Sequence, residues 1–391
     1  MRLFLTMLAL SVAVVAAPAC AQATAGDAAG DAGQAAQPYS EADFDRVRKF
    51  DAHVHDNVGT REFLDIAKKD GFEVLSINVD YPDFPPLADQ ARIAVAHRKI
   101  DPARFHFSTT FSMDDFGQWG WAEQVNAGIA KARSEGAVAV KVWKNIGMVD
   151  EDADGQRVFL DDPRFEPVWA YAEQSGLPLI AHQGEPYNCW LPLDQMTTEN
   201  DRAYFSAHPE YYMYLHPEEP SYEQIMAARD RLVAFHPKMS VVGAHLASLE
   251  WSVDRMSVFL DRFPNATLDM AARMSQIQYQ SVRDPQKVRD FFIKYQDRIM
   301  YATDLTHSPA DPNAKAQNPP VGNDGFAAEA DRVWRSDWRY LATPLSQRVD
   351  ALDADVPGLA LPRGVIDKIY YSNARRVFLG EGAGEGAPKQ S

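Results

Sequence analysis

The feature that most constrains the fold is a rhythm that begins near residue 49 and recurs along the chain. A short apolar run is followed by a loop and then by an amphipathic segment. The runs are rich in β-branched or aromatic residues and mostly apolar throughout, as strands covered on both faces should be. We expect eight β-strands, at residues 50–55, 72–79, 105–113, 137–143, 178–182, 239–246, 266–270 and 299–304.

The amphipathic segments between these runs are expected to form helices. Several end at Gly or just before Pro, where helix stop signals belong. The expected helices cover residues 60–70, 87–100, 121–135, 165–175, 222–235, 249–263, 286–297 and 365–378. Strands that alternate with helices form parallel βαβ units, and eight such units predict a closed (β/α)8 TIM barrel over residues 48–380.

Two long insertions interrupt the rhythm. Residues 187–220, after the fifth strand, are rich in aromatic side chains. Residues 307–360, after the eighth strand, contain Pro, Gly and Asn and then two Trp residues. Both insertions follow the C-terminal ends of strands, which form the face that carries the active site in barrels of this type. We therefore predict that the insertions help to shape a site.

The N-terminal residues 1–21 have the pattern of an export signal. Arg2 supplies a positive charge, residues 3–16 are apolar, and a stretch of small residues follows. We therefore expect an exported protein, periplasmic or secreted, with a lipid anchor on Cys20 as the alternative. The apolar run is too short to predict a membrane span.

The composition of the chain indicates which terminal segments are flexible, which partners are excluded and whether a disulfide is expected. Residues 22–47 are expected to form a flexible linker, and residues 381–391 a disordered tail. The net charge of −16 argues against nucleic acid or an anionic membrane as a partner. Cys189 is the only cysteine besides Cys20, so it is expected to be a structural residue without a disulfide. The sequence is compatible with a homo-oligomer and does not specify the oligomeric state.

Polar side chains stand where the apolar strands end. In the first strand, a period of two places His53 and His55 on one face, and Ala52 and Val54 on the other. Two imidazoles so placed can converge on one metal ion. Later strands carry Lys141, His182, His245 and Asp304 at or near their ends.

Each of these residues alone could be an ordinary core or capping residue. Together, four imidazoles, a lysine and an aspartate buried at one end of a barrel are costly unless they are paired or metal-bound. These ligand types suit zinc, manganese, iron or cobalt. The pattern therefore predicts a divalent metal site at the C-terminal ends of the strands.

Five motifs with their spacing resemble the amidohydrolase superfamily. They are Asp51-Ala52-His53-Val54-His55, Ala181-His182, Gly243-Ala244-His245, Ala302-Thr303-Asp304 and Asn373-Ala374-Arg375-Arg376-Val377-Phe378. The chain is most similar to the amidohydrolase-related family, which includes aminocarboxymuconate-semialdehyde decarboxylase and related lactonases and hydratases. The resemblance covers nearly all of residues 48–380 and implies a metal-dependent enzyme on a TIM barrel.

The resemblance also implies roles for individual residues. His53, His55, His182 and Asp304 would hold a catalytic metal, most often zinc, and His245 would contact the substrate or the nucleophilic water. Lys141 aligns with the position that bridges two ions in binuclear relatives. We expect one ion here, with Lys141 as a contact for a substrate carboxylate or as part of a structural ion pair.

The expected reaction is hydrolysis of an ester, lactone or amide bond in a small, cyclic molecule by a metal-activated water. Asp304 would transfer the proton, and His245 would steady the oxyanion or orient the water. The expected substrate contacts are Lys144, Glu185 and Arg273, with Trp143, Tyr187 and Trp190 as aromatic walls. The alternatives are a decarboxylase or other lyase on the same scaffold, and an exported binding protein without catalysis.

Overall fold

The structure is a computed structural model that describes residues 37–309 and 325–381. The predicted export signal at residues 1–21, the first part of the predicted linker and nearly all of the predicted tail lie outside the described residues. None of the helices within the described ranges has the length and apolar character that crossing a membrane requires.

All eight expected strands form, several of them shorter than predicted, and they pair in parallel in two arcs. The arcs have the orders β3-β2-β1-β9 and β4-β5-β6-β7-β8. The eight strands are β1 (Lys49–Asp56), β2 (Phe72–Ile77), β3 (Phe105–Ser108), β4 (Val140–Val142), β5 (Leu179–Ala181), β6 (Val241–Gly243), β7 (Ala266–Asp269) and β8 (Ile299–Met300). A short strand, β9 (Leu305–His307), follows β8 after a break and pairs with β1.

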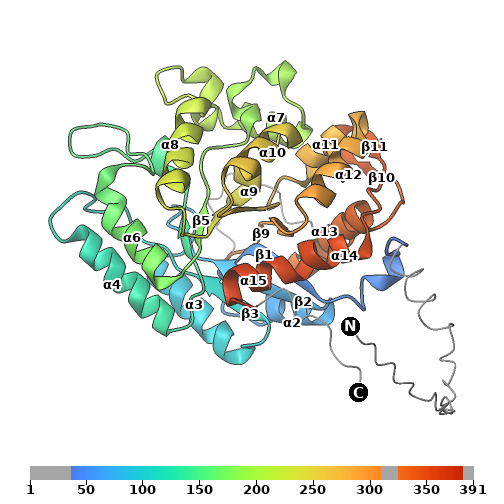
Figure 1. Ribbon diagram of the computed structural model, residues 1–391, viewed down its shortest axis with the longest axis horizontal. Coiled ribbons are helices and arrows are strands. Elements are labelled where there is room, and N and C mark those ends of the chain that lie inside the picture. Colours follow the sequence, from blue (N-terminus) through green and yellow to red (C-terminus); the bar gives the residue numbers. More distant parts are fainter. Residues whose placement is uncertain (1–36, 310–324, 382–391) are drawn as a thin grey trace, which may run out of the picture.

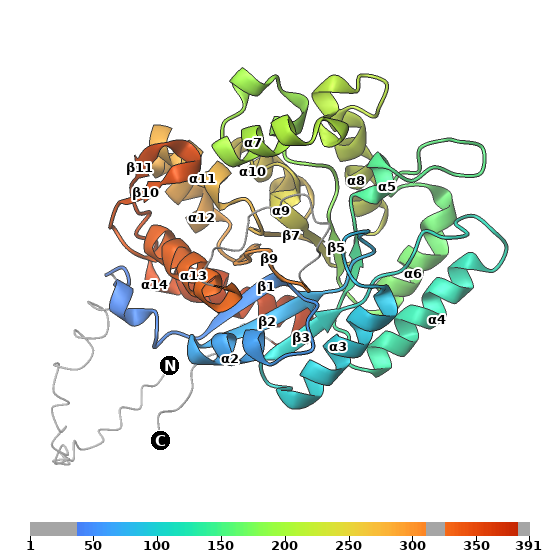
Figure 2. The same cartoon turned by 180° about the vertical axis from the view of Figure 1, so that it is seen from behind.

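Backbone hydrogen bonds join the two arcs at both seams. At one seam Thr109 forms a parallel bridge with Val140, and the amide of Lys141 donates to the Thr109 carbonyl over 2.7 Å. At the other, the amide of Ala52 donates to the Tyr301 carbonyl over 3.0 Å. The strands therefore close into the predicted (β/α)8 barrel, with helices arranged around them (Figures 1 and 2).

The eight expected helices also form, with small shifts at their ends. They are α2 (Glu62–Lys69), α3 (Leu87–Ile100), α4 (Trp121–Ser134), α6 (Glu166–Ser175), α8 (Tyr222–Phe235), α10 (Val253–Arg262), α12 (Pro285–Lys294) and a composite C-terminal helix of α14 (Arg363–Asp367), the π-helical η8 (Lys368–Ser372) and α15 (Asn373–Leu379). Local signals explain several ends. Ser221 caps α8 by accepting a hydrogen bond from the amide of Gln224, and α6 ends at Gly176, whose φ is 69°.

Several further elements were not expected from the sequence. They are α5 (Asn145–Met148), α7 (Glu199–Ala207), α9 (Ala244–Ala247), α11 (Met274–Arg283), α13 (Phe326–Ala342) and the antiparallel strands β10 (Gln347–Val349) and β11 (Ala354–Val356). The helix α13 lies within the insertion after β8 and packs beside α2 (Figure 2). Its side chains Phe326, Ala330, Trp334 and Trp338 recur every four residues and form a buried stripe. Residues 326–342 of this insertion thus form a helix that covers the barrel wall.

The packed domain begins earlier than predicted. Residues 37–47, assigned above to a flexible linker, lie against the C-terminal part of the chain and include the short helix η1 (Glu41–Asp43). Phe44 is buried, the Tyr39 ring lies 5.3 Å from that of Trp338, and the Trp338 indole N–H donates to the Ser40 carbonyl over 3.0 Å. The aromatic side chains in this stretch find apolar partners, which a composition argument does not detect.

The barrel interior holds a compact apolar cluster of its own. Alternate residues of the strands contribute to it, among them Leu75, Ile77, Ile180 and Met300. Phe378 of α15 joins this cluster, so the C-terminal helix contributes to the packing of the interior. The apolar filling leaves the C-terminal ends of the strands for polar side chains.

Candidate functional site

The predicted polar residues gather inside the barrel at the C-terminal ends of the strands. His53 and His55 point to the same face, as expected, but a register shift in β1 between Asp51 and Val54 places an extra residue in this strand. Ala52 therefore belongs to the interior cluster, while Val54 packs with the helix-side core. The simple alternation assumed for Ala52 and Val54 is wrong, because the bulge changes the parity of the strand.

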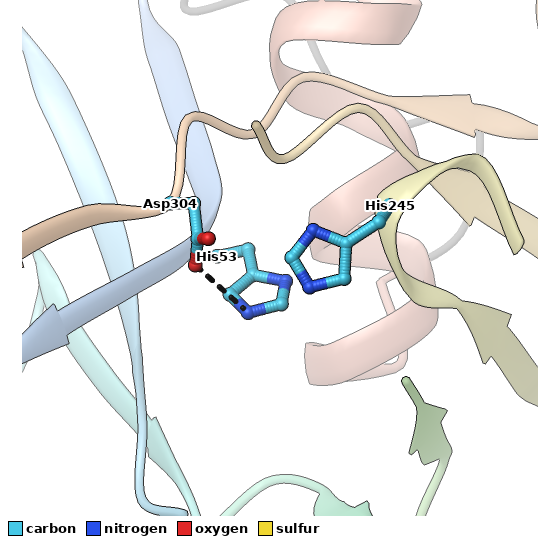
Figure 3. A group of neighbouring side chains, drawn as sticks. All are labelled: His53, His245 and Asp304. Atoms are coloured by element: carbon cyan, nitrogen blue, oxygen red, sulfur yellow. Dashed lines mark ion pairs between the residues drawn. The ribbon is translucent and has the colours of Figure 1, made fainter. Parts of the chain in front are cut away.

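The side chains form a close cluster around Asp304. The Asp304 Oδ1 atom lies 3.2 Å from His55 Nε2 and 3.5 Å from His53 Nε2. Ligand atoms of His53, His245 and Asp304 all lie within 4.8 Å of one another, and Figure 3 shows the three side chains close together. The ring of His182 lies beside that of His245, with 4.0 Å between their centroids.

The other ring nitrogens have hydrogen-bond partners that orient the imidazoles. The Nδ1 atom of His53 lies 2.9 Å from Asp269 Oδ2, and that of His55 lies 2.7 Å from the Ile77 carbonyl. The Nδ1 atom of His245 lies 2.9 Å from the Ala271 carbonyl. These acceptors place the proton on Nδ1 and leave the Nε2 lone pair free for a metal.

His182 completes the donor set. Its Nε2 atom is buried and has no hydrogen-bond partner among the described residues. A buried polar atom without a partner is costly, and a bound metal ion would supply one. The residues present therefore fit a divalent metal ion.

The protonation states of the clustered side chains suit metal binding. Burial lowers the pKa values of His53, His182 and His245, so these imidazoles are neutral. Burial alone would raise the pKa of Asp304, but the hydrogen bond from His55 and the electrostatic interactions with His245 and His53 outweigh it, and the pKa lies well below its usual range. A carboxylate surrounded by neutral imidazoles is the protonation state that metal binding requires.

Lys141 lies at the edge of this cluster. Its Nζ atom is 3.5 Å from His53 Nε2, and its side chain is almost fully buried. Burial lowers the pKa of the Lys141 amine to about 8, although Asp269 and Asp304 partly oppose this shift. No carboxylate oxygen of the described residues lies within 4.0 Å of the amine, so the predicted structural ion pair does not form there.

Two site residues are presented by left-handed backbone. Asp304 has a φ of 71° in the break between β8 and β9. His245 begins a run of positive φ angles, 55°, 58°, 55° and 53°, that ends at Ser248. Each such non-glycine residue costs about 1–2 kcal/mol, so tertiary contacts must hold the turn. The Ser248 hydroxyl donates to the Gln183 carbonyl over 2.6 Å, and the His245 amide donates to Asp269 Oδ1 over 2.8 Å.

Asp51 fixes the chain beside Asp304 from outside the barrel wall. Its Oδ1 atom accepts a hydrogen bond from the Thr303 amide over 3.1 Å. Its Oδ2 atom accepts from the Thr303 hydroxyl over 2.6 Å and from the Trp334 indole over 2.9 Å. Asp51, the first residue of the motif Asp51-Ala52-His53-Val54-His55, thus positions the residue that precedes Asp304.

A cavity of about 630 Å³ lies in front of the cluster. Trp143, Lys144, Glu185 and Arg273 line it, as the sequence predicted. The Lys144 amine contacts the Glu185 carboxylate, so these two charges neutralise each other. Most of the cavity's aromatic lining comes from Tyr81, Phe84, Tyr204, Phe205 and Tyr211.

Two predicted aromatic walls lie elsewhere. Tyr187 and Trp190 belong to the short helix η3 (Tyr187–Trp190) and do not line the cavity. The Tyr187 ring stacks on Trp251 at 4.7 Å, and the Trp190 ring packs edge-on against Tyr222 at 5.4 Å. These aromatic side chains fasten the insertion to α8 and the turn before α10.

Sequence reasoning missed Tyr81 and Phe84, which line the cavity from the loop after β2. That loop follows the C-terminal end of a strand, so the rule that singled out the other positions would have found them. Cys189 is buried, its thiol donates to the Tyr211 carbonyl, and burial raises its pKa, in keeping with a structural role.

The closed barrel with histidines and an aspartate at its C-terminal face defines a class of metal-dependent barrel enzymes. The sequence matches the profile of the amidohydrolase family over residues 16–379, and the chain therefore belongs to this family. No curated protein sequence gives a significant match.

The chain is also similar to several solved structures, among them a decarboxylase, a zinc-bound amidohydrolase and a hydratase. 2,6-Dihydroxybenzoate decarboxylase, in complex with 2,6-dihydroxybenzoate, is 15% identical, with 85% of this chain and 99% of that chain covered and a TM-score of 0.48. An amidohydrolase from Burkholderia multivorans with bound zinc is 12% identical, with 85% and 99% covered and a TM-score of 0.45. 4-Oxalomesaconate hydratase from Rhodopseudomonas palustris is 11% identical, with 81% and 79% covered and a TM-score of 0.42.

Proposed function

We propose that this protein is a metal-dependent hydrolase that acts on an ester, lactone or amide bond of a small, cyclic substrate. The observation that carries the proposal is the convergence of imidazole Nε2 atoms on Asp304, with the Nδ1 atoms already engaged. In this proposal His53, His55, His182 and Asp304 hold the ion. The complete donor set speaks against a binding protein that has lost catalysis.

A single ion, preferably zinc, suits the site best. In this proposal the Lys141 amine, 3.5 Å from His53 Nε2, contacts a carboxylate of the substrate instead of bridging two ions. Within residues 37–309 and 325–381, only one group of side chains brings three metal-ligand atoms together. This single group supports one ion per chain.

A divalent ion in this site supplies Lewis acidity that activates water and polarises a carbonyl group. The protein residues then move the protons. Asp304 Oδ1 faces His53 and His55, which leaves Oδ2 to accept a proton from the attacking water and return it to the leaving group. His245 keeps its proton on Nδ1, so its Nε2 atom accepts a hydrogen bond and orients the water.

Metal analysis of variants tests this proposal. Purified wild-type protein should bind about one zinc ion per chain, whereas His53→Ala and Asp304→Asn should bind far less and lose turnover on esters and lactones. His216→Ala removes an imidazole from the insertion outside the cluster and should keep both metal and turnover. Full zinc binding and near-normal turnover in either site variant would show that the proposed site is wrong.

A carbon–carbon lyase is the second candidate, and one observation favours it. Lys141 and Arg273 line the cavity without a carboxylate partner within 4.0 Å in the described structure, as a site that binds a substrate carboxylate requires. Release of carbon dioxide from aromatic carboxylates by the zinc-loaded enzyme, without ester or lactone turnover, would establish this reaction in place of hydrolysis.

A further inference from the structure

Arg273 is a buried cation that the structure leaves incompletely paired. It stands at the residue before α11, is 8% exposed and lines the cavity. Its Nη1 atom donates to the Ala272 carbonyl over 3.0 Å, and this is its only side-chain hydrogen bond to the described residues. No carboxylate oxygen among those residues lies within 4.0 Å of the guanidinium, in contrast to Lys144 with its partner Glu185.

The free donors of this guanidinium are suited to an anion in the cavity. Neither the Nε atom nor the Nη2 atom of Arg273 has an acceptor among the described residues. The Nε atom is fully buried, and the Nη2 atom is not. A buried guanidinium without a carboxylate is costly unless a ligand completes its hydrogen bonds. The planar fork of arginine matches the two oxygens of a carboxylate.

Arg273 is also tied to the metal-ligand cluster through the backbone. The amide of Ala272, which has a φ of 53°, donates to the Thr303 carbonyl over 3.1 Å. Thr303 immediately precedes Asp304, so the turn that carries Arg273 is bonded to the turn that carries the proposed base.

The carboxylates around the cavity have other partners. Asp201 accepts hydrogen bonds from Asn188 over 2.7 Å and from Gln276 over 2.9 Å. Glu250 is a buried acid outside the cavity lining, and burial raises its pKa to about 7 although the charge of Arg273 opposes this shift. Its Oε1 atom accepts from the Tyr187 amide over 2.7 Å, its Oε2 atom has no hydrogen-bond partner among the described residues, and neither oxygen lies within 4.0 Å of the Arg273 guanidinium. An external anion is therefore the available partner for the exposed edge of the guanidinium.

An aromatic wall leads from the histidines along the cavity. The ring centroids are 5.0 Å apart for His55 and Phe84, 5.1 Å for Phe84 and Tyr81, and 4.9 Å for Tyr81 and Trp143. Such a wall suits a flat, apolar ring, because aromatic faces pack well against one another. The cavity thus joins a surface for a ring with a receptor for an anion.

We infer that Arg273 binds the carboxylate of a ring-containing substrate and holds it beside the metal-ligand cluster. This inference rests on the proposed function, because it assigns the substrate class of the same site. It makes Arg273 a specificity-determining residue that selects ring compounds with a carboxylate over neutral analogues.

Calorimetric titration of the zinc-loaded protein with benzoate and with benzamide tests the inference. Both probes share the ring, but only benzoate carries the anion. Wild-type protein should bind benzoate at least about tenfold more tightly than benzamide, because charge-assisted hydrogen bonds to arginine are strong. Arg273→Gln should weaken benzoate binding at least about tenfold and leave benzamide binding unchanged, and Arg273→Lys should lie between the two.

Controls separate this inference from the proposed function. Arg283→Gln, at the exposed end of α11, should bind benzoate as the wild type does. Arg273→Gln should keep the zinc content of the wild type, which would be lost if the variant disrupted the metal site. The same titrations on EDTA-treated protein test whether benzoate binds to the metal.

The outcomes are decisive in both directions. Benzoate binding that is lost with zinc but unaffected by Arg273→Gln would overturn the inference and leave the proposed metal site standing. The absence of benzoate binding to wild-type protein, or equal affinity for benzoate and benzamide, would also overturn it. Binding that weakens in both Arg273 variants, in the presence and absence of zinc, would support it.

Discussion

At the scale of single residues, the structure separates the side chains that would touch a metal from those that hold them in place. The strand-end rule identified His53, His55, His182, His245 and Asp304 from the sequence, because each follows an apolar run. It did not reveal the buried acceptors behind these residues. Hydrogen-bond partners of a histidine come from other strands, and a local pattern carries no information about them.

Asp51 provides a test of this supporting layer. Four donors face its carboxylate, namely the Thr303 amide and hydroxyl, the Trp334 indole and, more distantly, the His53 amide. In Asp51→Asn the new NH2 group must face a donor in either orientation, so Thr303 and the adjacent Asp304 should shift. We expect kcat/KM on the best substrate to fall about 10–100-fold, the range seen when metal-supporting residues are changed.

Trp334→Phe is the matched control for this variant. It removes one of the donors but preserves a ring that can pack against Phe72. Its loss of kcat/KM should be smaller than that of Asp51→Asn, while circular dichroism shows that both variants are folded. Wild-type kcat/KM in folded Asp51→Asn would contradict a positioning role for Asp51.

At the scale of elements, the sequence predicted the regular strands and helices well, and it missed the irregular joints between them. The expected helix over residues 249–263 begins only at Val253, because the chain first passes through the left-handed turn of residues 245–248. Positive φ angles at His245 and Leu246 contradict local preference and are fixed by contacts that are distant in sequence. The helix α13 was missed because an apparent loop composition hid its stripe of buried aromatic side chains.

Gly243 permits the left-handed turn to fold back over β6. A Cβ atom at this position would lie 2.5 Å from Ala247 Cβ and 3.2 Å from Leu268 Cδ2. Gly243→Ala should therefore lower the free energy of unfolding by about 1–3 kcal/mol, the usual cost of overpacking, and displace His245. Urea unfolding measures the first effect, and loss of turnover in the zinc-loaded variant measures the second.

Gly128→Ala serves as the control, since it lies in α4 and an added Cβ meets no atom within 4 Å. This substitution should raise stability by about 0.5–1 kcal/mol and leave turnover unchanged, because alanine is the better helix former. Equal stability and turnover in Gly243→Ala and wild type would show that the turn relaxes without consequence for His245.

At the scale of the whole molecule, segments far apart in the sequence complete one another. The helix α13 follows the last barrel strand. Its Trp334 indole donates a hydrogen bond to Asp51, near the start of the domain. The same helix carries Asp337, a buried acid that accepts a hydrogen bond from the Tyr301 hydroxyl over 2.9 Å. The barrel could be predicted from the alternation of apolar strands and amphipathic helices along the chain. The contacts that stabilise its seam could not be predicted, because they join residues that are far apart in the sequence.

Asp337 should make the stability of the molecule depend on pH. Burial raises its pKa from 3.8 to about 7, so between these values the folded protein holds a proton that the unfolded chain has released. The unfolded state binds fewer protons there, and the free energy of unfolding must fall as pH rises from about 4 to about 7.

Asp337→Asn retains an acceptor for Tyr301 but cannot ionise. Urea unfolding at pH 5 and pH 8 should show a decrease in stability about 2 kcal/mol smaller in the variant than in wild type. Identical decreases in both proteins would show that Asp337 ionises normally in the folded state.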